Sequence, residues 1–236
     1  MCGRVTITSS GERLAEEFAL SQWPSEQVRY NLAPTQLFNI IRNKPDSEPA
    51  VREVASVRWG FIPEWSAPPF SALINARSET VTQKPAFRNA FKRRRCLIPV
   101  DGFFEWKKIG KIRQPYLFRR ADHKPLALAG LWERCLTDPA GPVDTCVILT
   151  THANKLVEPL HDRMPVIVDP ASFELWLDPK IEDFDTIRPL FQPFPEEKME
   201  SIPVDRCVND VSNDSPECIQ RVTLVSPPVQ QMFNFD

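Results

Sequence analysis

The sequence lacks the features that mark several large classes of protein. No apolar run in its 236 residues approaches the roughly 20 residues that a membrane-spanning helix needs. The N-terminus lacks the basic-then-apolar layout of a secretory signal. The cysteines show no C-x-x-C or ladder spacing, which argues against a zinc site and against a disulfide framework. We therefore expect a protein of the reducing cytoplasm with no membrane segment, no metal and no cofactor.

Glycine is scarce as well, with seven residues against 24 prolines, which favours stiff loops over flexible ones. Fifteen phenylalanines and six tryptophans are ample for a hydrophobic core. Short alternating segments outnumber helices, and most connections have hairpin length. These features predict an α+β fold: one domain over residues 1–236 with a curved, barrel-like, mostly antiparallel β-sheet core and short flanking helices.

The pattern assigns individual elements as well. Helices are expected at 12–20, 85–92, 153–160, 169–177 and 184–191, and a long loop at 21–34. Strands are expected at 2–8, 35–42, 51–59, 71–77, 96–100, 103–108, 116–120, 126–134, 143–151, 199–204 and 218–225.

The two halves of the chain differ in charge. The net charge of −2 speaks against a nucleic-acid-binding protein. Residues 1–120, however, hold 20 Lys+Arg and 11 Asp+Glu, whereas residues 121–236 hold 9 and 20. This asymmetry predicts one basic face, which matters more for phosphate binding than the global sum. Alternatively, the halves interleave in space and their charges cancel.

Cys2 directly follows the initiator methionine. Because that methionine is removed before small residues, we expect the mature chain to begin at Cys2, with an amine and a thiol on adjacent carbons. The amine has an ordinary pKa of about 7.7–8.0, so part of it is neutral at pH 7 and can form a Schiff base with an aldehyde. The thiol can then close a thiazolidine ring. Alternatively, Cys2 is a small apolar residue that opens an edge strand.

Three polar residues lie where chemistry is plausible. Glu105 alternates with large aromatics in Phe103-Phe104-Glu105-Trp106, so partial burial would raise its pKa towards general acid–base use, unless it faces water. Asn75 and Arg77 share one strand face and suit a carbonyl and a phosphate, although polar strand ends without a role are common.

Two loops add further candidates. His161 lies between an expected helix and an expected strand, where catalytic groups often occur, although a structural histidine fits equally well. The three prolines at 63, 68 and 69 make the loop around Trp65 stiff. This loop is either a rigid apolar wedge or a segment that folds its aromatics into the core.

Together these segments resemble one family, the SRAP proteins (SOS response-associated peptidases or abasic-site-processing proteins). The resemblance covers about residues 2–225. It is carried, in order, by Met1-Cys2-Gly3-Arg4, Tyr30-Asn31-x-Ala33-Pro34, Trp59-Gly60-Phe61-x-Pro63, Ile74-Asn75-Ala76-Arg77-x-Glu79-Thr80, Arg95-Cys96-Leu97-Ile98-Pro99 with Gly102-Phe103-Phe104-Glu105-Trp106, Ala129-Gly130-Leu131-Trp132, and His161-Asp162-Arg163-Met164-Pro165.

The resemblance implies a sensor of abasic sites in single-stranded DNA or at single-strand/double-strand junctions. Cys2 would form a thiazolidine crosslink with the ring-opened sugar and so protect the strand from cleavage. The implied catalytic residues are Cys2, Asn75 as the residue that orients the intermediate, Glu105 as the proton shuttle that opens the sugar, and His161 as the residue that assists imine chemistry. The implied DNA-binding residues are Arg4, Pro34, Trp65, Phe70, Arg77 and Arg163. Family members often have a second tryptophan where this chain has Ser66, so Phe70 is the expected substitute.

The resemblance further implies a cytoplasmic, bacterial or phage-encoded protein that joins the nucleoid when it acts, and we expect a monomer. The peptidase label would describe self-processing, or aminopeptidase action, that exposes Cys2, alongside lyase-type chemistry. Two alternatives stay open. One is an N-terminal-nucleophile cysteine amidohydrolase, whose thiol attacks an amide. The other is a non-covalent single-stranded DNA-binding module with stacking aromatics.

Overall fold

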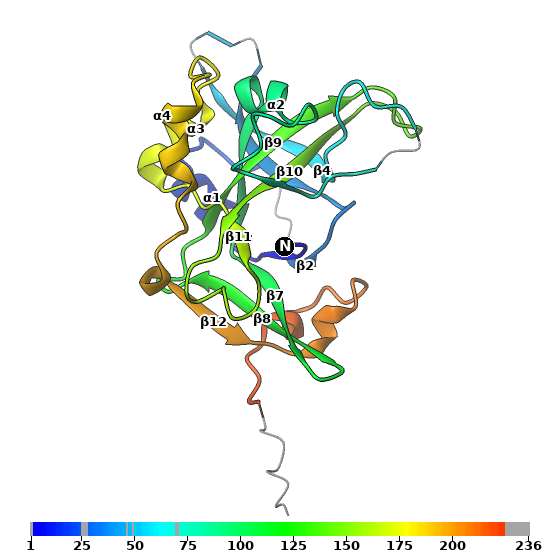
Figure 1. Ribbon diagram of the computed structural model, residues 1–236, viewed down its shortest axis with the longest axis vertical. Coiled ribbons are helices and arrows are strands. Elements are labelled where there is room, and N and C mark those ends of the chain that lie inside the picture. The colour runs from blue at the N-terminus through cyan, green and yellow to red at the C-terminus, as the bar shows by residue number, and fades with distance from the viewer. Residues whose placement is uncertain (1, 25–27, 46, 49, 69–70, 225–236) are drawn as a thin grey trace, which may run out of the picture.

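Two β-sheets make up the frame of the molecule in the computed structural model (Figure 1). The structure describes residues 2–24, 28–45, 47–48, 50–68 and 71–224. The smaller sheet has five strands, and each neighbouring pair runs antiparallel. Its spatial order is β12 (Met199–Pro203), β8 (Ile112–Arg120), β7 (Gly102–Ile109), β1 (Val5–Ile7) and β2 (Arg29–Leu32).

The larger sheet has seven strands and curls back on itself. Its path runs β11 (Arg163–Pro165), β10 (Val143–His152), β4 (Arg52–Trp59), β3 (Leu37–Asn43), β6 (Arg95–Val100) and β9 (Leu126–Cys135), with β5 (Asn75–Arg77) on β10. A further pairing between β9 and β10 closes a ring. Only β4 and β5 run parallel to β10. The expected curved, barrel-like and mostly antiparallel core is confirmed.

The helices are short and lie outside the sheets, also as expected. They are α1 (Gly11–Glu17), α2 (Arg88–Arg93), α3 (Phe173–Leu177) and α4 (Phe184–Ile187). The side chain of Ser10 accepts a hydrogen bond from the backbone of Arg13 and so caps α1. Short 3-10 turns add η1 (Pro170–Ser172), η2 (Arg188–Phe191), η3 (Glu196–Lys198), η4 (Arg206–Asn209) and η5 (Pro216–Ile219). Among the described residues, no helix combines the length and apolarity that a bilayer crossing requires.

The core falls into two clusters that share strand β7. Alternation along the strand sends Phe103 into the main core, where it stacks on Phe118 with 5.3 Å between ring centroids. Phe104 faces the opposite way, into a smaller cluster with Leu117 and Val208. The sequence pattern predicted these opposite faces. The smaller cluster holds the segment around η4 and η5 against the sheet that carries the N-terminal residues.

Three local assignments are wrong. Residues 153–160 form successive turns instead of a helix, and the side chain of Asn154 accepts a hydrogen bond from the backbone of Val157 at 3.1 Å. The expected loop at 21–34 contains β2. The expected strand at 218–225 begins within η5, and its contact with the sheet is one bridge between Arg221 and Val204.

Candidate functional site

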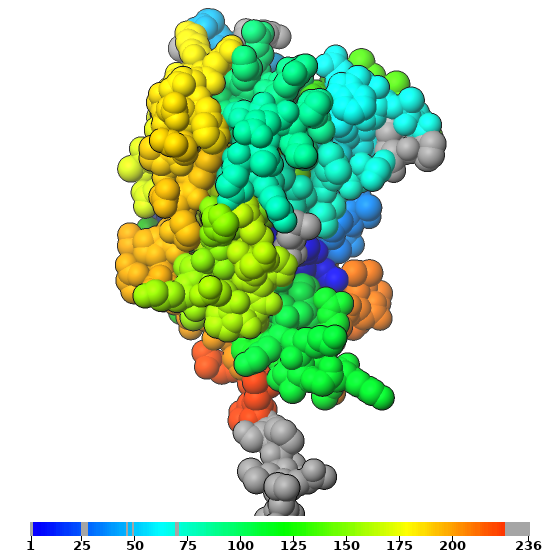
Figure 2. Space-filling view, in the orientation of Figure 1, coloured from blue at the N-terminus to red at the C-terminus, as the bar shows by residue number. Residues whose placement is uncertain are grey.

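The candidate site lies where the two sheets meet around Cys2. Figure 2 shows the blue N-terminal residues between the green strands β7 and β8 and the yellow-green segment that follows β10. The C-terminal half of β10 has β5 on one side and β11 on the other, so Thr150 pairs with both Arg77 and Pro165. Since β5 carries Asn75 and β11 follows His161, one strand positions two of the predicted catalytic residues.

Cys2 is completely buried and belongs to the main core. Its Sγ lies 3.9 Å from the carbonyl oxygen of Arg4. Burial raises the pKa of the Cys2 thiol far above its usual range, and the charge of Glu105 adds to this effect. The thiol is therefore protonated at neutral pH, and the expected partner Glu105 is close enough to influence it.

Strand pairing explains how Glu105 reaches Cys2. In the β1–β7 ladder Val5 pairs with Phe103, and the backbone N–H of Phe104 donates to the carbonyl of Arg4 at 3.0 Å. Antiparallel strands run past each other one residue at a time, so Glu105 lies beside the chain directly after Cys2. Glu105 is 4% exposed.

The buried carboxyl group of Glu105 is poised for proton transfer. Burial raises its pKa to about 7, although the positive charge of Arg113 opposes the shift, and the negative charge of Asp162 supports it. A group with this pKa exchanges its proton readily at neutral pH, which is the requirement for general acid–base catalysis. The sequence-based alternative in which Glu105 faces water is wrong.

Asn75 holds the backbone of Cys2. Its Nδ2 donates to the carbonyl oxygen of Cys2 at 2.8 Å and so joins the larger sheet to the N-terminal segment. The amide oxygen of Asn75 is buried and has no hydrogen-bond partner within the described part of the chain. An unsatisfied buried acceptor is costly and rare in folded proteins, so it indicates a place where a ligand donates.

His161 completes the group at the entrance of β11. The backbone N–H of Arg163 donates to its Nδ1 at 2.9 Å, which places the proton of the neutral ring on Nε2. Burial lowers the pKa of His161, while the carboxylate of Asp162, 2.9 Å from Nδ1, opposes this shift. The lowered pKa favours the neutral ring at pH 7. Because Asp162 also acts on Glu105, the structure brings Cys2, Asn75, Glu105 and His161 into one group.

Two arginines assigned to DNA binding are buried and already engaged. Arg4 donates from Nη1 to the side chain of Asn31 and to the carbonyl of Val208, the latter at 2.8 Å. Arg163 makes a two-pronged ion pair with Glu79 at 2.7 and 2.9 Å. Glu79 keeps a lowered pKa because the Arg163 hydrogen bonds outweigh the effect of burial. Both arginines brace the walls of the site.

The other DNA-binding candidates lie at the surface. Arg77 is exposed on β5, two residues from Asn75 and therefore on the same strand face. Trp65 is 70% exposed on a loop whose ends are joined by paired backbone hydrogen bonds between Phe61 and Leu73. Pro34 is half-buried in a turn after β2. Phe70 lies outside the described residues.

Several supporting residues have a role that the sequence did not predict. Asn31 is the partner of Arg4, and Glu79 is the partner of Arg163. Asp162 supplies the carboxylate beside His161, and the charge of Arg113 opposes the rise in the pKa of Glu105. The first three lie inside the family motifs, so the motifs themselves were the available signal. The position of Arg113 on the strand that pairs with β7 was a weaker one.

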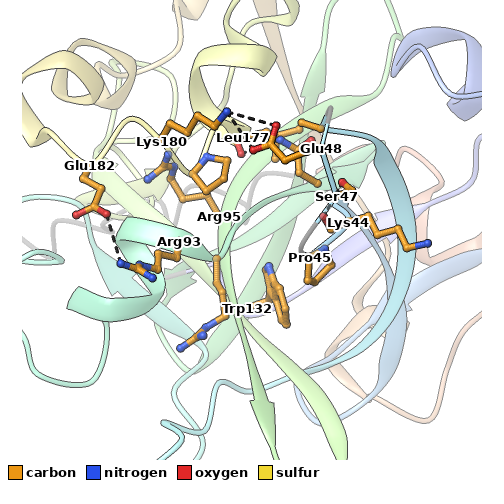
Figure 3. Close-up of a pocket in the computed structure, with 14 residues that line it drawn as sticks. Lys44, Pro45, Ser47, Glu48, Arg93, Arg95, Trp132, Leu177, Lys180 and Glu182 are labelled. Atoms are coloured by element: carbon orange, nitrogen blue, oxygen red, sulfur yellow. Dashed lines mark hydrogen bonds and ion pairs between the residues drawn. The ribbon is translucent and has the colours of Figure 1, made fainter.

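A cavity of about 750 Å³ lies elsewhere, between the β3–β4 turn, the end of α2 and the chain after α3 (Figure 3). Four of the five cations that line it, Arg93, Arg94, Arg95 and Lys180, have partners already. Lys180 pairs with Glu48 at 3.1 Å, and Arg95 donates to backbone carbonyls, including that of Trp176 at 2.6 Å. Neither Cys2 nor any of the three residues grouped around it lines this cavity. In the part of the chain that the structure covers, no group of three His, Cys, Asp or Glu side chains is arranged to hold a metal.

Comparison with known proteins identifies the family of the chain. Residues 1–211 match the family model described as SOS response associated peptidase (SRAP). The chain is 38% identical over 226 residues to the abasic site processing protein YoqW of Bacillus subtilis, with 93% of this chain and 99% of that protein covered. It is 28% identical to the abasic site processing protein HMCES of Xenopus tropicalis, with coverages of 95% and 79%. A crystal structure of a protein from Bacteroides thetaiotaomicron superposes with a TM-score of 0.79 at 26% identity and covers 94% of this chain and 100% of that one.

Proposed function

Since the chain belongs to the SOS response-associated peptidase family, we propose that it processes abasic sites in DNA by forming a covalent crosslink through Cys2. The relatives that share most of its length are named abasic site processing proteins. The observation that carries the proposal is the grouping of Asn75, Glu105 and His161 around Cys2, which supplies the helpers that an N-terminal aminothiol needs.

The first step is exposure of the amine. Removal of Met1, by self-processing or by an aminopeptidase, frees the nitrogen of Cys2. It also deletes the residue attached to that nitrogen. The proposal requires this removal because an acylated nitrogen cannot form an imine, and it also requires that the sugar gain access to the buried Cys2 side chain.

Glu105 then releases the aldehyde. An abasic deoxyribose is mostly a closed hemiacetal, and its opening needs a proton moved from the anomeric hydroxyl, whose oxygen becomes the aldehyde oxygen, to the ring oxygen as the ring C–O bond breaks. With a pKa of about 7, Glu105 can donate one proton and take up the other. The amine of Cys2 attacks the aldehyde carbon, and loss of water leaves an imine.

Ring closure produces the stable product. The Cys2 sulfur bonds to the imine carbon, and the thiol proton passes to the imine nitrogen, which gives a five-membered thiazolidine. Asn75 keeps the Cys2 backbone in place through Nδ2, and its buried oxygen accepts from the reacting nitrogen or a sugar hydroxyl. His161, neutral with its proton on Nε2, assists proton transfer during imine formation and reversal. Closure diverts the imine from β-elimination and so protects the strand.

DNA binding is assigned to the surface around this group. We assign the phosphates next to the lesion to Arg77 and the separation of neighbouring bases to Trp65 and Pro34, in single strands or at single-strand/double-strand junctions. Arg4 and Arg163 contribute by holding the walls of the site, since their guanidinium groups are buried against Asn31 and Glu79. The protein acts as a cytoplasmic monomer in this proposal.

Incubation with an abasic-site oligonucleotide tests the proposal. We expect a heat-stable, shifted band with the wild type and none with Cys2→Ala. Cys2→Ser keeps the amine but loses the thiol, so it should form an imine that borohydride traps and a cleaved strand instead of the stable band. Mass measurement of the purified protein first verifies that Met1 is absent.

Two other outcomes would contradict it. Glutaminase activity without a crosslinked band would identify an N-terminal-nucleophile amidohydrolase. Equal, purely non-covalent binding of intact and abasic strands would identify a single-stranded DNA-binding module.

A further inference from the structure

The tip of the β7–β8 hairpin is an exposed basic surface outside the group around Cys2. All seven residues from 107 to 113 are exposed. They include four cations, Lys107, Lys108, Lys111 and Arg113, and the sequence from 106 to 120 contains no Asp or Glu. The hairpin extends beyond the rest of the smaller sheet in Figure 1, at the lower right, and as the green projection in Figure 2.

The residues of this tip do not stabilise the hairpin that they form. Lys108 lies directly opposite Arg113 in the strand register, and like charges at such positions destabilise a hairpin. Ile109 pairs with Ile112, and these two side chains remain 45% and 46% exposed. A tip that served only solubility would not need two exposed isoleucines. The combination indicates a surface that is completed by a partner.

The base of the hairpin is rigid and connected to the candidate site. Two guanidinium groups lie near the ring of Trp106, that of Arg4 at 5.8 Å and that of Arg113 at 5.6 Å from the ring centroid. The indole N–H donates to the side chain of Asn209 at 2.6 Å, and Asn209 in turn donates to the carbonyl of Arg113 at 3.2 Å. The strand that presents Glu105 to Cys2 therefore continues as a braced arm to the exposed tip.

Resting on the function proposed above, we propose that this tip is a second DNA contact, which binds backbone phosphates about four nucleotides from the abasic sugar on one side of the lesion. Ile109 lies four positions after Glu105 in β7, and strand geometry places the two residues about 13 Å apart. A strand whose bases stay stacked rises about 3.4 Å per nucleotide, as each strand of a duplex does, which gives the distance of about four nucleotides.

The chemistry of the tip fits a sugar-phosphate backbone. Lysine is a strongly hydrated, flexible point charge that suits phosphate oxygens without reading sequence. The exposed pair of Ile109 and Ile112 can pack on deoxyribose carbons between the phosphates. A contact on one side of the lesion would orient the strand as its sugar enters the site.

The test compares two triple variants that remove equal charge. Lys107→Ala/Lys108→Ala/Lys111→Ala changes the tip. The control Lys44→Ala/Lys92→Ala/Lys180→Ala removes two lysines that line the cavity in Figure 3 and Lys92, which pairs with the lining residue Glu182. Binding is measured with oligonucleotides that carry a tetrahydrofuran abasic analogue, which has no aldehyde and so cannot crosslink. One oligonucleotide has eight nucleotides on both sides of the analogue, and two others keep a long arm on only the 5′ or only the 3′ side.

We expect the tip variant to weaken binding of the two-armed oligonucleotide about tenfold at moderate salt. The logarithmic salt slope should shrink by about one for each phosphate that the tip no longer binds. Only one of the single-arm oligonucleotides should show this weaker binding, and the control variant should bind like the wild type. Since the tip lysines are exposed and one faces a like charge, thermal unfolding should show no loss of stability.

Several results would overturn the inference. Unchanged affinity and salt slope in the tip variant, equal losses of affinity on both single arms, or an equal loss in the control variant would each contradict a located contact. The proposed function is judged separately, by the crosslinked band with a true abasic site. A wild type that binds the analogue but never crosslinks would refute that function and leave the hairpin result standing.

Discussion

Replacement of Glu105 by glutamine should make the protein more stable and less active. The carboxyl group is buried, and its pKa rises from 4.5 to about 7 on folding. Below pH 4.5 the group is protonated in both the folded and the unfolded state, so it costs nothing. Between pH 4.5 and 7 the unfolded state releases the proton more readily, so the wild type loses stability as pH rises. The amide of Glu105→Gln carries no charge at any pH.

The size of the effect follows from the shift. One pKa unit corresponds to about 1.4 kcal/mol. The difference in free energy of unfolding between the variant and the wild type should therefore be larger at pH 8 than at pH 4.5 by up to about 3 kcal/mol, in favour of the variant. For a chain of this length, that corresponds to roughly 6–12 °C in Tm. Urea unfolding at several pH values measures it, and exposed Glu197→Gln serves as the control.

Crosslinking supplies the second readout. Because Glu105→Gln cannot exchange a proton, single-turnover crosslinking should slow by about 100-fold or more, with DNA affinity nearly unchanged. The reasoning fails if the wild type and Glu105→Gln show the same pH dependence of unfolding, since the pKa of the Glu105 carboxyl group would then be the same in the folded and the unfolded state. A large loss of DNA affinity would instead identify Glu105 as structural.

The remaining predictions concern the other walls of the site. Asn75→Ala should slow single-turnover crosslinking about tenfold, the cost of one or two hydrogen bonds near the reacting nitrogen. His161→Ala should slow the same reaction by about 100-fold, and added imidazole should restore part of the rate. Glu79→Gln leaves the charge of Arg163 buried without a carboxylate, so it should lower the free energy of unfolding in urea by about 1.5–3 kcal/mol. Trp65→Ala removes a side chain that is 70% exposed, so Tm should stay constant while affinity for abasic single strands falls by about 1–3 kcal/mol in fluorescence anisotropy.

The sequence predicted best what neighbouring residues decide. In β7 the alternation of Phe103, Phe104, Glu105 and Trp106 gave the two faces of the strand correctly, because successive side chains of any strand point to opposite sides. The strands expected at 103–108 and 116–120 form the β7–β8 hairpin, whose turn contains Gly110 with a φ of 58° that suits glycine. In both cases the information lies within a few residues.

Burial of the two arginines depended on distant partners. Arg4 contacts Asn31, 27 residues away, and the carbonyl of Val208, 204 residues away. Arg163 pairs with Glu79 across 84 residues. An arginine in a motif can bind either a DNA phosphate or a polar group inside the protein, and only the fold decides which of the two it contacts. The sequence therefore assigned both arginines to DNA phosphates, and the fold gives them internal partners instead.

In residues 153–160 a tertiary contact prevents the helix that the local sequence pattern predicted. Asn154 donates from Nδ2 to the carbonyl of Phe194 at 2.7 Å, 40 residues away, and its Oδ1 accepts from Val157. Asparagine side chains compete with helical hydrogen bonds in this way, and Pro159 cannot supply a backbone donor. The resulting turns carry the chain to His161, so the irregular backbone serves the site better than a helix would.

The pKa values also set the order of the proposed steps. The thiolate is the reactive form of cysteine, and burial together with the charge of Glu105 keeps the Cys2 thiol protonated at the outset. The α-amine, with an ordinary pKa of about 7.7–8.0, is partly neutral at pH 7, so it attacks the aldehyde first. When Glu105 takes up a proton during these transfers, its charge disappears and one of the two causes of the raised thiol pKa disappears with it. The thiol thus becomes more reactive only once an imine is there to receive it.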